Sequence, residues 1–233
     1  MELPCYVVSL KRELARREHT AREFGREGIR FEFVDAVDGK ELRADERISR
    51  SLGVPIVSGD IACTMSHGLA MKTMLAHGHE RALIFEDDVW LAPGFAQTIG
   101  KLLSAPVSWE FLKLSGFSTP PYTKCVDHHG YRFIWPEIAS LSGQGYVVTA
   151  AGANKFIPFT QPADDIFDLL VQQVWRTKID LVEVLPRLVG GIDLASTIEH
   201  ERQSAYMKPR TFAARWQRRA SKLRRSFWKR LRR

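Results

Sequence analysis

The sequence has few cysteines and no long hydrophobic run, and both absences limit what the chain can be. Its three cysteines, Cys5, Cys63 and Cys125, are odd in number and far apart. They fit neither a disulfide framework nor a zinc-binding spacing, which predicts a reducing compartment. No apolar stretch reaches the roughly 18 residues that span a bilayer, and residues 1–5 lack the features of a signal peptide. We therefore expect a cytoplasmic chain.

Acidic residues are missing from the end of the chain, although the rest is rich in them. Residues 208–233 contain 12 Lys and Arg and no Asp or Glu, whereas residues 1–207 contain 22 basic and 27 acidic residues. The formal charge of +7 therefore divides into an acidic body and a strongly basic tail. Such asymmetry is typical of a surface-binding appendage, so we predict a folded domain over residues 1–207 and a tail over residues 208–233.

The basic tail has the periodicity of an amphipathic helix. Its apolar residues recur every three or four positions and fall on one helical face, while most basic residues lie on other faces. A basic amphipathic helix with aromatic residues on its apolar face binds in the headgroup region of an anionic bilayer. A solvated or RNA-binding tail is the alternative. The residues predicted to contact the membrane are Trp216, Phe227, Arg218, Arg219 and Arg225.

The most informative segment places three acids directly after a short apolar run. Residues 82–85 have the composition of a buried strand, and Glu86, Asp87 and Asp88 follow at once. Carboxylates gathered at a strand end repel one another and lose solvation, unless a cation neutralises them. Hard divalent cations prefer oxygen ligands, so the segment predicts a Mg²⁺ or Mn²⁺ site that also takes substrate phosphate oxygens. The alternative is a solvated acidic turn that caps the next helix.

The order of the predicted elements indicates an α/β fold. Residues 4–10, 11–25 and 29–37 read as strand, helix and strand, the unit from which parallel sheets are built. Further strands are predicted at 82–85, 111–116, 145–149 and 179–185, with a loop or hairpin over 117–137. Helices are predicted at 41–52, 61–76, 95–103, 150–159 and 166–176.

Basic residues gather where the first predicted strand meets the first helix. Ligands of open α/β sheets bind beyond the carboxyl ends of strands, and Ser9, Arg12 and Arg16 lie at such a corner. These side chains could receive a diphosphate, and the alternative is a solvated basic helix face. His67, in the middle of the helix at 61–76, is interpreted as a packed core residue.

Taken in order, these segments resemble glycosyltransferase family 25, the bacterial lipooligosaccharide glycosyltransferases related to collagen galactosyltransferases. The resemblance covers about residues 4–200, and it depends on order and spacing because no single segment is specific. This chain has Ser9 where the family usually has Asn, and Ala163 where it usually has Val. The matching segments are 7–10 with Arg12 and Arg16, 33–39, 59–63 with Ser66 and His67, 82–89, 113–114, 145–148 with Gly152, Ala153 and Lys155, and 162–164.

The resemblance implies an inverting hexosyltransferase with a GT-A-like fold, in which helices flank a mostly parallel central sheet. The hexose, galactose or glucose, would pass from a UDP-sugar to a saccharide acceptor of lipooligosaccharide or of another cell-surface glycan. An acceptor growing on the inner leaflet would place the protein on the inner face of the bacterial inner membrane. No nucleic-acid partner is expected.

The resemblance also implies roles for individual residues. The three acids would take the part of the family's Asp-x-Asp motif, with Asp88 and Glu86 as ligands of Mn²⁺ or Mg²⁺ and Asp87 directed at the donor's ribose or sugar. An inverting transfer needs a carboxylate base, for which Asp164 and Asp165 are the candidates. The implied donor-binding residues are Ser9, Leu10, Arg12, Arg16, Glu86, Asp87 and Gln144.

Two other functions are compatible with parts of the sequence. A phosphohydrolase of the haloacid dehalogenase type also places an Asp-x-Asp motif after an apolar strand, but the first acid here is Glu86. A nucleic-acid-binding protein with an inert α/β body would account for the basic tail. Release of UDP that depends on a divalent cation distinguishes the transferase from both.

Overall fold

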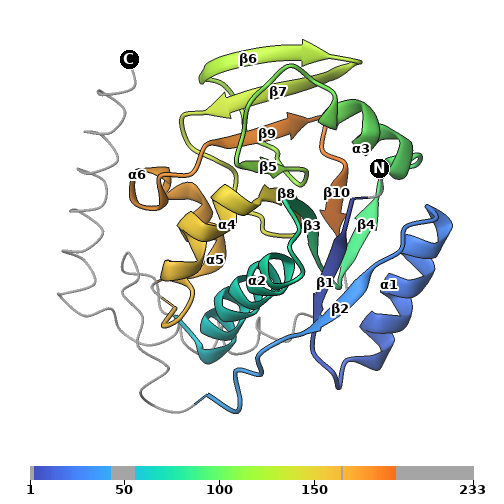
Figure 1. Ribbon diagram of the computed structural model, residues 1–233, viewed down its shortest axis with the longest axis vertical. Helices are drawn as coiled ribbons and strands as arrows, with labels where there is room; N and C mark the ends of the chain where they lie inside the picture. Colours follow the sequence, from blue (N-terminus) through green and yellow to red (C-terminus); the bar gives the residue numbers. More distant parts are fainter. Residues whose placement is uncertain (1–2, 43–55, 164, 193–233) are drawn as a thin grey trace.

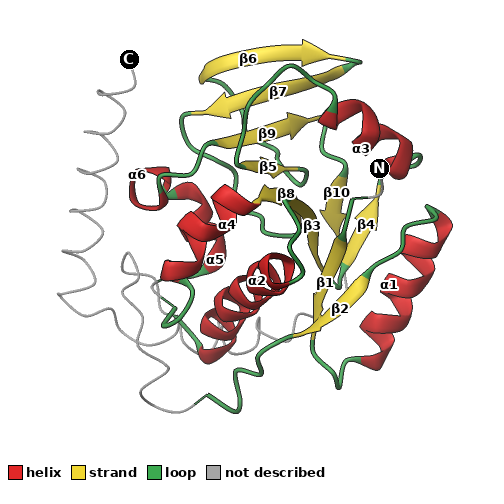
Figure 2. Cartoon of the chain, viewed as in Figure 1, coloured by secondary structure: helices red, strands yellow, loops and turns green. Residues whose placement is uncertain are grey.

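An eight-stranded sheet runs through the structure, and helices cover both of its faces (Figure 1). The computed structural model describes residues 3–42, 56–163 and 165–192. Helices α2 (Ser58–Ala76), α4 (Ala150–Phe156) and α5 (Phe167–Gln172) lie on one face, and α1 (Leu14–Arg26) and α3 (Phe95–Leu103) lie on the other (Figure 2). The predicted α/β class, a mostly parallel sheet flanked by helices, is confirmed.

The remaining elements are two short helical segments, a two-stranded ribbon and the strands of the main sheet. A short helix, α6 (Val174–Thr177), follows α5, and a 3-10 turn (Ile157–Phe159) follows α4. Two short strands, β4 (Val89–Leu91) and β10 (Val189–Gly191), form a separate antiparallel ribbon. The strands of the main sheet are β1 (Cys5–Ser9), β2 (Glu32–Asp35), β3 (Arg81–Glu86), β5 (Phe111–Lys113), β6 (Tyr122–His128), β7 (Tyr131–Pro136), β8 (Gly145–Thr149) and β9 (Leu181–Leu185).

The order of strands in the sheet is β2-β1-β3-β8-β5-β9-β7-β6. β1 pairs in parallel with β2 and β3, and β5 pairs in parallel with β9. β8 is antiparallel to both of its neighbours, and so is β7, which leaves six of the eight strands pointing the same way. The carboxyl ends of β1, β2 and β3 therefore meet at one edge of the sheet.

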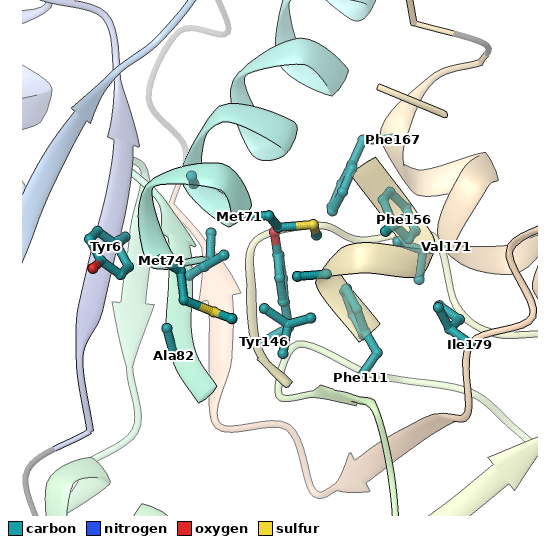
Figure 3. Packing of buried hydrophobic residues seen from close by; sticks show 14 of the residues in the cluster. Tyr6, Met71, Met74, Ala82, Phe111, Tyr146, Phe156, Phe167, Val171 and Ile179 are labelled. Atoms are coloured by element: carbon teal, nitrogen blue, oxygen red, sulfur yellow. The ribbon is translucent and has the colours of Figure 1, made fainter. Parts of the chain in front are cut away.

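Alternate residues of the strands fill two separate cores. In β3, Ala82 and Ile84 pack with α2 and α4, whereas Leu83 and Phe85 pack with α1 and α3. On the α2 face, Met71 lies among aromatic side chains that include Tyr146 of β8 (Figure 3). This two-sided burial explains why the strands are apolar at consecutive positions instead of alternating with polar residues.

Most predicted elements are present, and the differences have physical causes. The helices expected at 61–76 and 95–103 are α2 and α3, and residues 117–137 contain the β6–β7 hairpin. The single helix expected at 166–176 is divided into α5 and α6 because Gln173 has a non-helical ψ of 51°. The predicted helix at 41–52 lies almost wholly outside the described residues, and the tail helix lies entirely outside them. Within the described ranges no helix is both long enough and apolar enough to cross a bilayer.

Candidate functional site

A cavity of about 400 Å³ opens at the edge where β1, β2 and β3 end. This volume lies within the range of roughly 300–1,000 Å³ that is usual for small-molecule sites. The segments after the three strands form one wall, and the starts of α2 and α5 form another. The predicted residues that line it are Ser9, Leu10, Arg12, Arg16, Glu86, Asp87, Asp88 and Gln144.

The three acids point in different directions because the alternation of β3 continues beyond the strand. Glu86 faces α2, where its Oε1 lies 3.5 Å from Nε2 of His67. Asp87 faces α1 and is only 5% exposed. Its carboxylate accepts hydrogen bonds of 2.7 Å from both Ser9 Oγ and Arg16 Nη1. As predicted, the side chain of Asp87 points to the face opposite that of Glu86. It contacts β1 and α1, however, and these contacts fix the acidic segment.

Asp88 has one carboxylate oxygen held by the protein and one without a protein partner. Oδ2 accepts a hydrogen bond of 2.9 Å from Arg16 Nη2. Oδ1 is buried and has no hydrogen-bond partner in the described part of the chain. Burial, and then the negative charge of Glu86, raise the pKa of Asp88 to about 6. A buried carboxylate oxygen without a donor, next to a second carboxylate, is the environment that a hard divalent cation fits.

One face of α1 holds the acidic segment and the strand β4 that follows it. The residues involved are three or four positions apart, so their side chains lie on the same side of the helix. Besides the contacts of Arg16, Thr20 Oγ1 donates to the Asp87 carbonyl at 3.2 Å, and His19 Nε2 lies 2.8 Å from the Val89 carbonyl. Further along α1, Glu23 Oε1 accepts a bond of 2.7 Å from the Leu91 amide, and Arg26 Nη2 donates to the Leu91 carbonyl at 2.8 Å.

The basic corner after β1 differs from its prediction. Arg16 contacts two acids of the site, and Arg12 forms an ion pair with Asp38. Arg17 Nη2 donates to Asp35 Oδ1 at 2.6 Å. The guanidinium groups of Arg12 and Arg16, which the sequence suggested could receive a diphosphate, thus have carboxylate partners within the protein. Arg12 and Arg16 still line the cavity, and their contact with a donor remains a prediction.

His67 and Cys63 lie beside Glu86 on the α2 side of the cavity. The imidazole of His67 is fully buried, stacks on Phe167 at 3.7 Å between ring centroids, and has Nδ1 3.0 Å from the hydroxyl of Tyr146. Burial lowers the pKa of His67 to about 4, so the ring is neutral at physiological pH. The sequence identified His67 as a core residue, which agrees with its burial, but gave no sign of its contact with Glu86.

The two candidate bases are not equivalent in the structure. Asp164 lies outside the described residues. Asp165 is 1% exposed and does not line the cavity, and its carboxylate accepts bonds of 2.9 Å from the Ile166 amide and from Gln173 Nε2. These contacts hold the carboxylate of Asp165 inside the protein, and the role of Asp164 or Asp165 as base remains a prediction. Asp168, in the first turn of α5, lines the cavity instead.

A buried ion pair supports the loops beside the cavity. Lys113 of β5 and Glu183 of β9 are paired in register, are at most 1% exposed, and have Nζ 3.8 Å from Oε1. Glu183 also accepts bonds from the amides of Ser118 (3.2 Å) and Ser140 (2.8 Å). The backbone carbonyl of Gln144, next to these loops, accepts a hydrogen bond of 3.1 Å from the Glu86 amide.

Some predicted site residues lie outside the described part of the chain. Among them are the membrane-contacting residues Trp216, Phe227, Arg218, Arg219 and Arg225.

Comparisons with known proteins show which sequences this chain resembles. The sequence model described as "Glycosyltransferase family 25 (LPS biosynthesis protein)" matches residues 2–171. The lipooligosaccharide biosynthesis protein lic2B of Haemophilus influenzae is 32% identical over 167 residues, which are 64% of this chain and 60% of that protein. Human procollagen galactosyltransferase 2 is 25% identical over 194 residues, which cover 71% of this chain and 30% of the human protein.

The chain spans about 60% of the length of the Haemophilus proteins that it matches. Among solved structures, a glycosyltransferase involved in the glycosylation of the major capsid of PBCV-1 superposes with a TM-score of 0.49 at 10% identity. That superposition covers 88% of this chain and 99% of the other.

Proposed function

Because the chain belongs to glycosyltransferase family 25, we propose that it transfers a hexose from a UDP-sugar to a saccharide acceptor of lipooligosaccharide or of a related surface glycan. Galactose and glucose are the candidate sugars, and inversion at the anomeric carbon is the proposed stereochemistry. One observation carries the proposal. Glu86 and Asp88 both line the cavity at the end of β3, and Asp88 Oδ1 is buried with no hydrogen-bond donor among the described residues.

Glu86 and Asp88 would hold a Mn²⁺ or Mg²⁺ ion. Such an ion, when bound, neutralises the diphosphate of the leaving nucleotide as a Lewis acid. Arg16 on α1 holds the acidic segment in place, because it donates to Asp87 and Asp88 at the same time. Asp87 is thus proposed to position the site, and Asp88 to bind the cation.

Asp168 is the proposed general base. A base must lie within hydrogen-bond reach of the acceptor hydroxyl, and Asp168 is a carboxylate of α5 that lines the same cavity as the acidic segment. The carboxylate of Asp168 lies close to Gly143, where a Cβ atom would lie 3.1 Å from Asp168 Oδ1 and 2.6 Å from the Phe167 ring. Glycine at position 143 therefore leaves room for the start of α5 to border the cavity.

The proposal is tested by UDP release from UDP-galactose and UDP-glucose in the presence of a saccharide acceptor. We expect turnover with Mn²⁺, loss in EDTA, and recovery when Mn²⁺ is added back. Asp88→Asn should reduce kcat/KM by at least about 10²-fold, since it removes one charged ligand of the cation. The matched control is Asp127→Asn, whose carboxylate is 71% exposed on the β6–β7 hairpin.

Three results would count against this function. Full activity in EDTA would exclude the cation site. Equal loss in Asp88→Asn and Asp127→Asn would show a general effect of removing charge. Release of inorganic phosphate without UDP would favour the phosphohydrolase instead.

A further inference from the structure

Three side chains of different chemistry converge beside the acidic segment. Cys63 and His67 are four positions apart on α2, so they lie on the same face of the helix, and Glu86 ends the neighbouring strand β3. One potential ligand atom from each residue, a thiol sulfur, a ring nitrogen and a carboxylate oxygen, lies within 4.8 Å of the other two. Their spacing in the sequence gives no metal-binding pattern, because Glu86 comes from another element.

The imidazole of His67 is directed at this cluster and has an unused nitrogen. Nε2 is buried and has no hydrogen-bond partner within the described residues. Nδ1 bonds to the hydroxyl of Tyr146 at 3.0 Å, and the ring stacks on Phe167 at an interplanar angle of 7°. When Nδ1 donates to Tyr146, Nε2 presents its lone pair. Outer contacts of this kind fix the tautomer and orientation of metal-binding histidines.

We propose that Cys63, His67 and Glu86 form a binding site for a borderline-soft divalent cation of the Zn²⁺ or Co²⁺ class. A thiolate and an imidazole favour such ions, whereas Mg²⁺ and Mn²⁺ prefer oxygen ligands alone. The site therefore differs in chemistry from the oxygen site at Asp88. Three protein ligands leave one position of a tetrahedral ion for water, as in zinc sites that are open to a cavity.

Glu86 belongs to both sites, so the two cations compete for it. Cys63 and Glu86 line the cavity, and an ion bound between them occupies space at its α2 wall. Zinc is thus expected to displace manganese from Glu86, and manganese is not expected to occupy the thiolate site.

The test is titration of the purified full chain with Co²⁺ alone, followed by absorption spectroscopy. We expect a sulfur-to-cobalt charge-transfer band that saturates at one equivalent and disappears when Zn²⁺ is added. Cys63→Ser should abolish the band and weaken Zn²⁺ binding, measured against a chromophoric chelator, by at least about 10-fold. Cys125→Ser is the matched control because Cys125 is an exposed thiol, and this variant should keep both the band and the affinity.

Glu86→Gln supplies a second variant that leaves the thiol in place. It should keep a charge-transfer band but weaken Zn²⁺ binding, again by at least about 10-fold. Absence of the band in the wild-type chain, or its persistence in a folded Cys63→Ser variant, would overturn the proposal. So would loss of the band in Cys125→Ser, because the bound cobalt would then be at a surface thiol. These readouts do not depend on transferase activity, so the two proposals can fail separately.

Discussion

Acidic side chains that are close in the sequence have different environments in this protein, and Asp165 and Asp168, three positions apart, show the contrast most clearly. Asp168 lines the cavity, and Asp165 is 1% exposed and bonded to Gln173. We expect Asp168→Asn to lower kcat by about 10²-fold with little change in the KM for the donor, since a positioned base contributes about that factor. Steady-state kinetics with varied donor and acceptor provide the measurement.

Asp165→Asn is the comparison for that experiment. It should lower the free energy of unfolding by about 1–3 kcal/mol, because the contacts of a buried carboxylate are disturbed, while kcat changes less than in Asp168→Asn. The opposite pattern, with turnover lost only in Asp165→Asn, would return the role of base to Asp165. No change in kcat in either variant would remove α5 from the catalytic site.

The sequence identified the acids of the site but could not give each one its role. Glu86, Asp87 and Asp88 follow an apolar strand, and this local pattern was sufficient to predict their position. Asp168 was missed because an aspartate in the first turn of a helix has an ordinary explanation as a partner of the helix dipole. Only the packing of α5 against α2 shows that it borders the cavity. Asp165 and its neighbour Asp164 could not be ranked, because burial of the Asp165 carboxylate depends on Gln173.

At the scale of elements, β5 and β9 are joined by a charged pair that has no contact with solvent. Lys113 and Glu183 are 1% and 0% exposed, and burial lowers the pKa of Lys113 although Glu183 opposes the shift. Glu183→Ala should reduce the free energy of unfolding by about 3–5 kcal/mol, since it leaves a buried ammonium group without its partner. Urea unfolding of the variant and the wild type measures the difference.

The matched control is Glu18→Ala, which breaks an ion pair with Arg22 on α1 where both side chains are more than half exposed. Its effect should stay below about 1 kcal/mol, because exposed pairs contribute little to stability. Similar losses in the two variants would contradict the role of burial. A stable Glu183→Ala protein would indicate that Lys113 adapts through its bond to the Ser140 carbonyl.

Elements with a local apolar pattern were predictable from the sequence, and the short ribbon of β4 and β10 was not. The 19 residues of α2 and the nine of α3 carry enough periodic positions to define a helix. The strands β4 and β10 have three residues each, and they pair over a separation of about a hundred positions in the sequence. Their formation depends on α1 and on the Gly190 backbone, where a Cβ atom would lie 2.6 Å from the Trp90 ring. No local pattern encodes such a pairing.

At the scale of the whole molecule, the sheet class was predictable but its strand order was not. Parallel β1, β2 and β3 follow from the strand–helix–strand order at the start of the chain. The insertion of antiparallel β8 between β3 and β5 is a tertiary arrangement. Its residues are buried on both faces, so its apolar pattern resembles that of the parallel strands in the sheet.

The tail over residues 208–233 remains a prediction from the sequence, and we propose that it attaches the catalytic domain, residues 1–207, to the inner face of the inner membrane. Its 12 basic residues each contribute about 1 kcal/mol near an anionic surface, before screening by salt. We expect the full chain to co-sediment with anionic liposomes, less at high salt, and a chain ending at Met207 to stay in solution while keeping turnover of a soluble acceptor.

A Trp216→Ser and Phe227→Ser double variant separates insertion from charge attraction. It should bind anionic liposomes more weakly than the wild type if the apolar face enters the headgroup region. Equal sedimentation of the truncated chain would contradict the proposal. Equal binding of the double variant would show that charge alone is sufficient.

The alternation of β3 also determines where this scaffold accepts extra residues. One inserted residue between Arg81 and Glu86 would send the following side chains to the opposite face, so the two cores would exchange members and the acids would lose their neighbours. The turn between β6 and β7 has no such restriction, because His129 and Gly130 lie outside the paired residues and β6 is the edge strand of the sheet. Grafted loops and natural length variation are therefore expected at the hairpin turn, where they leave the acidic segment in register.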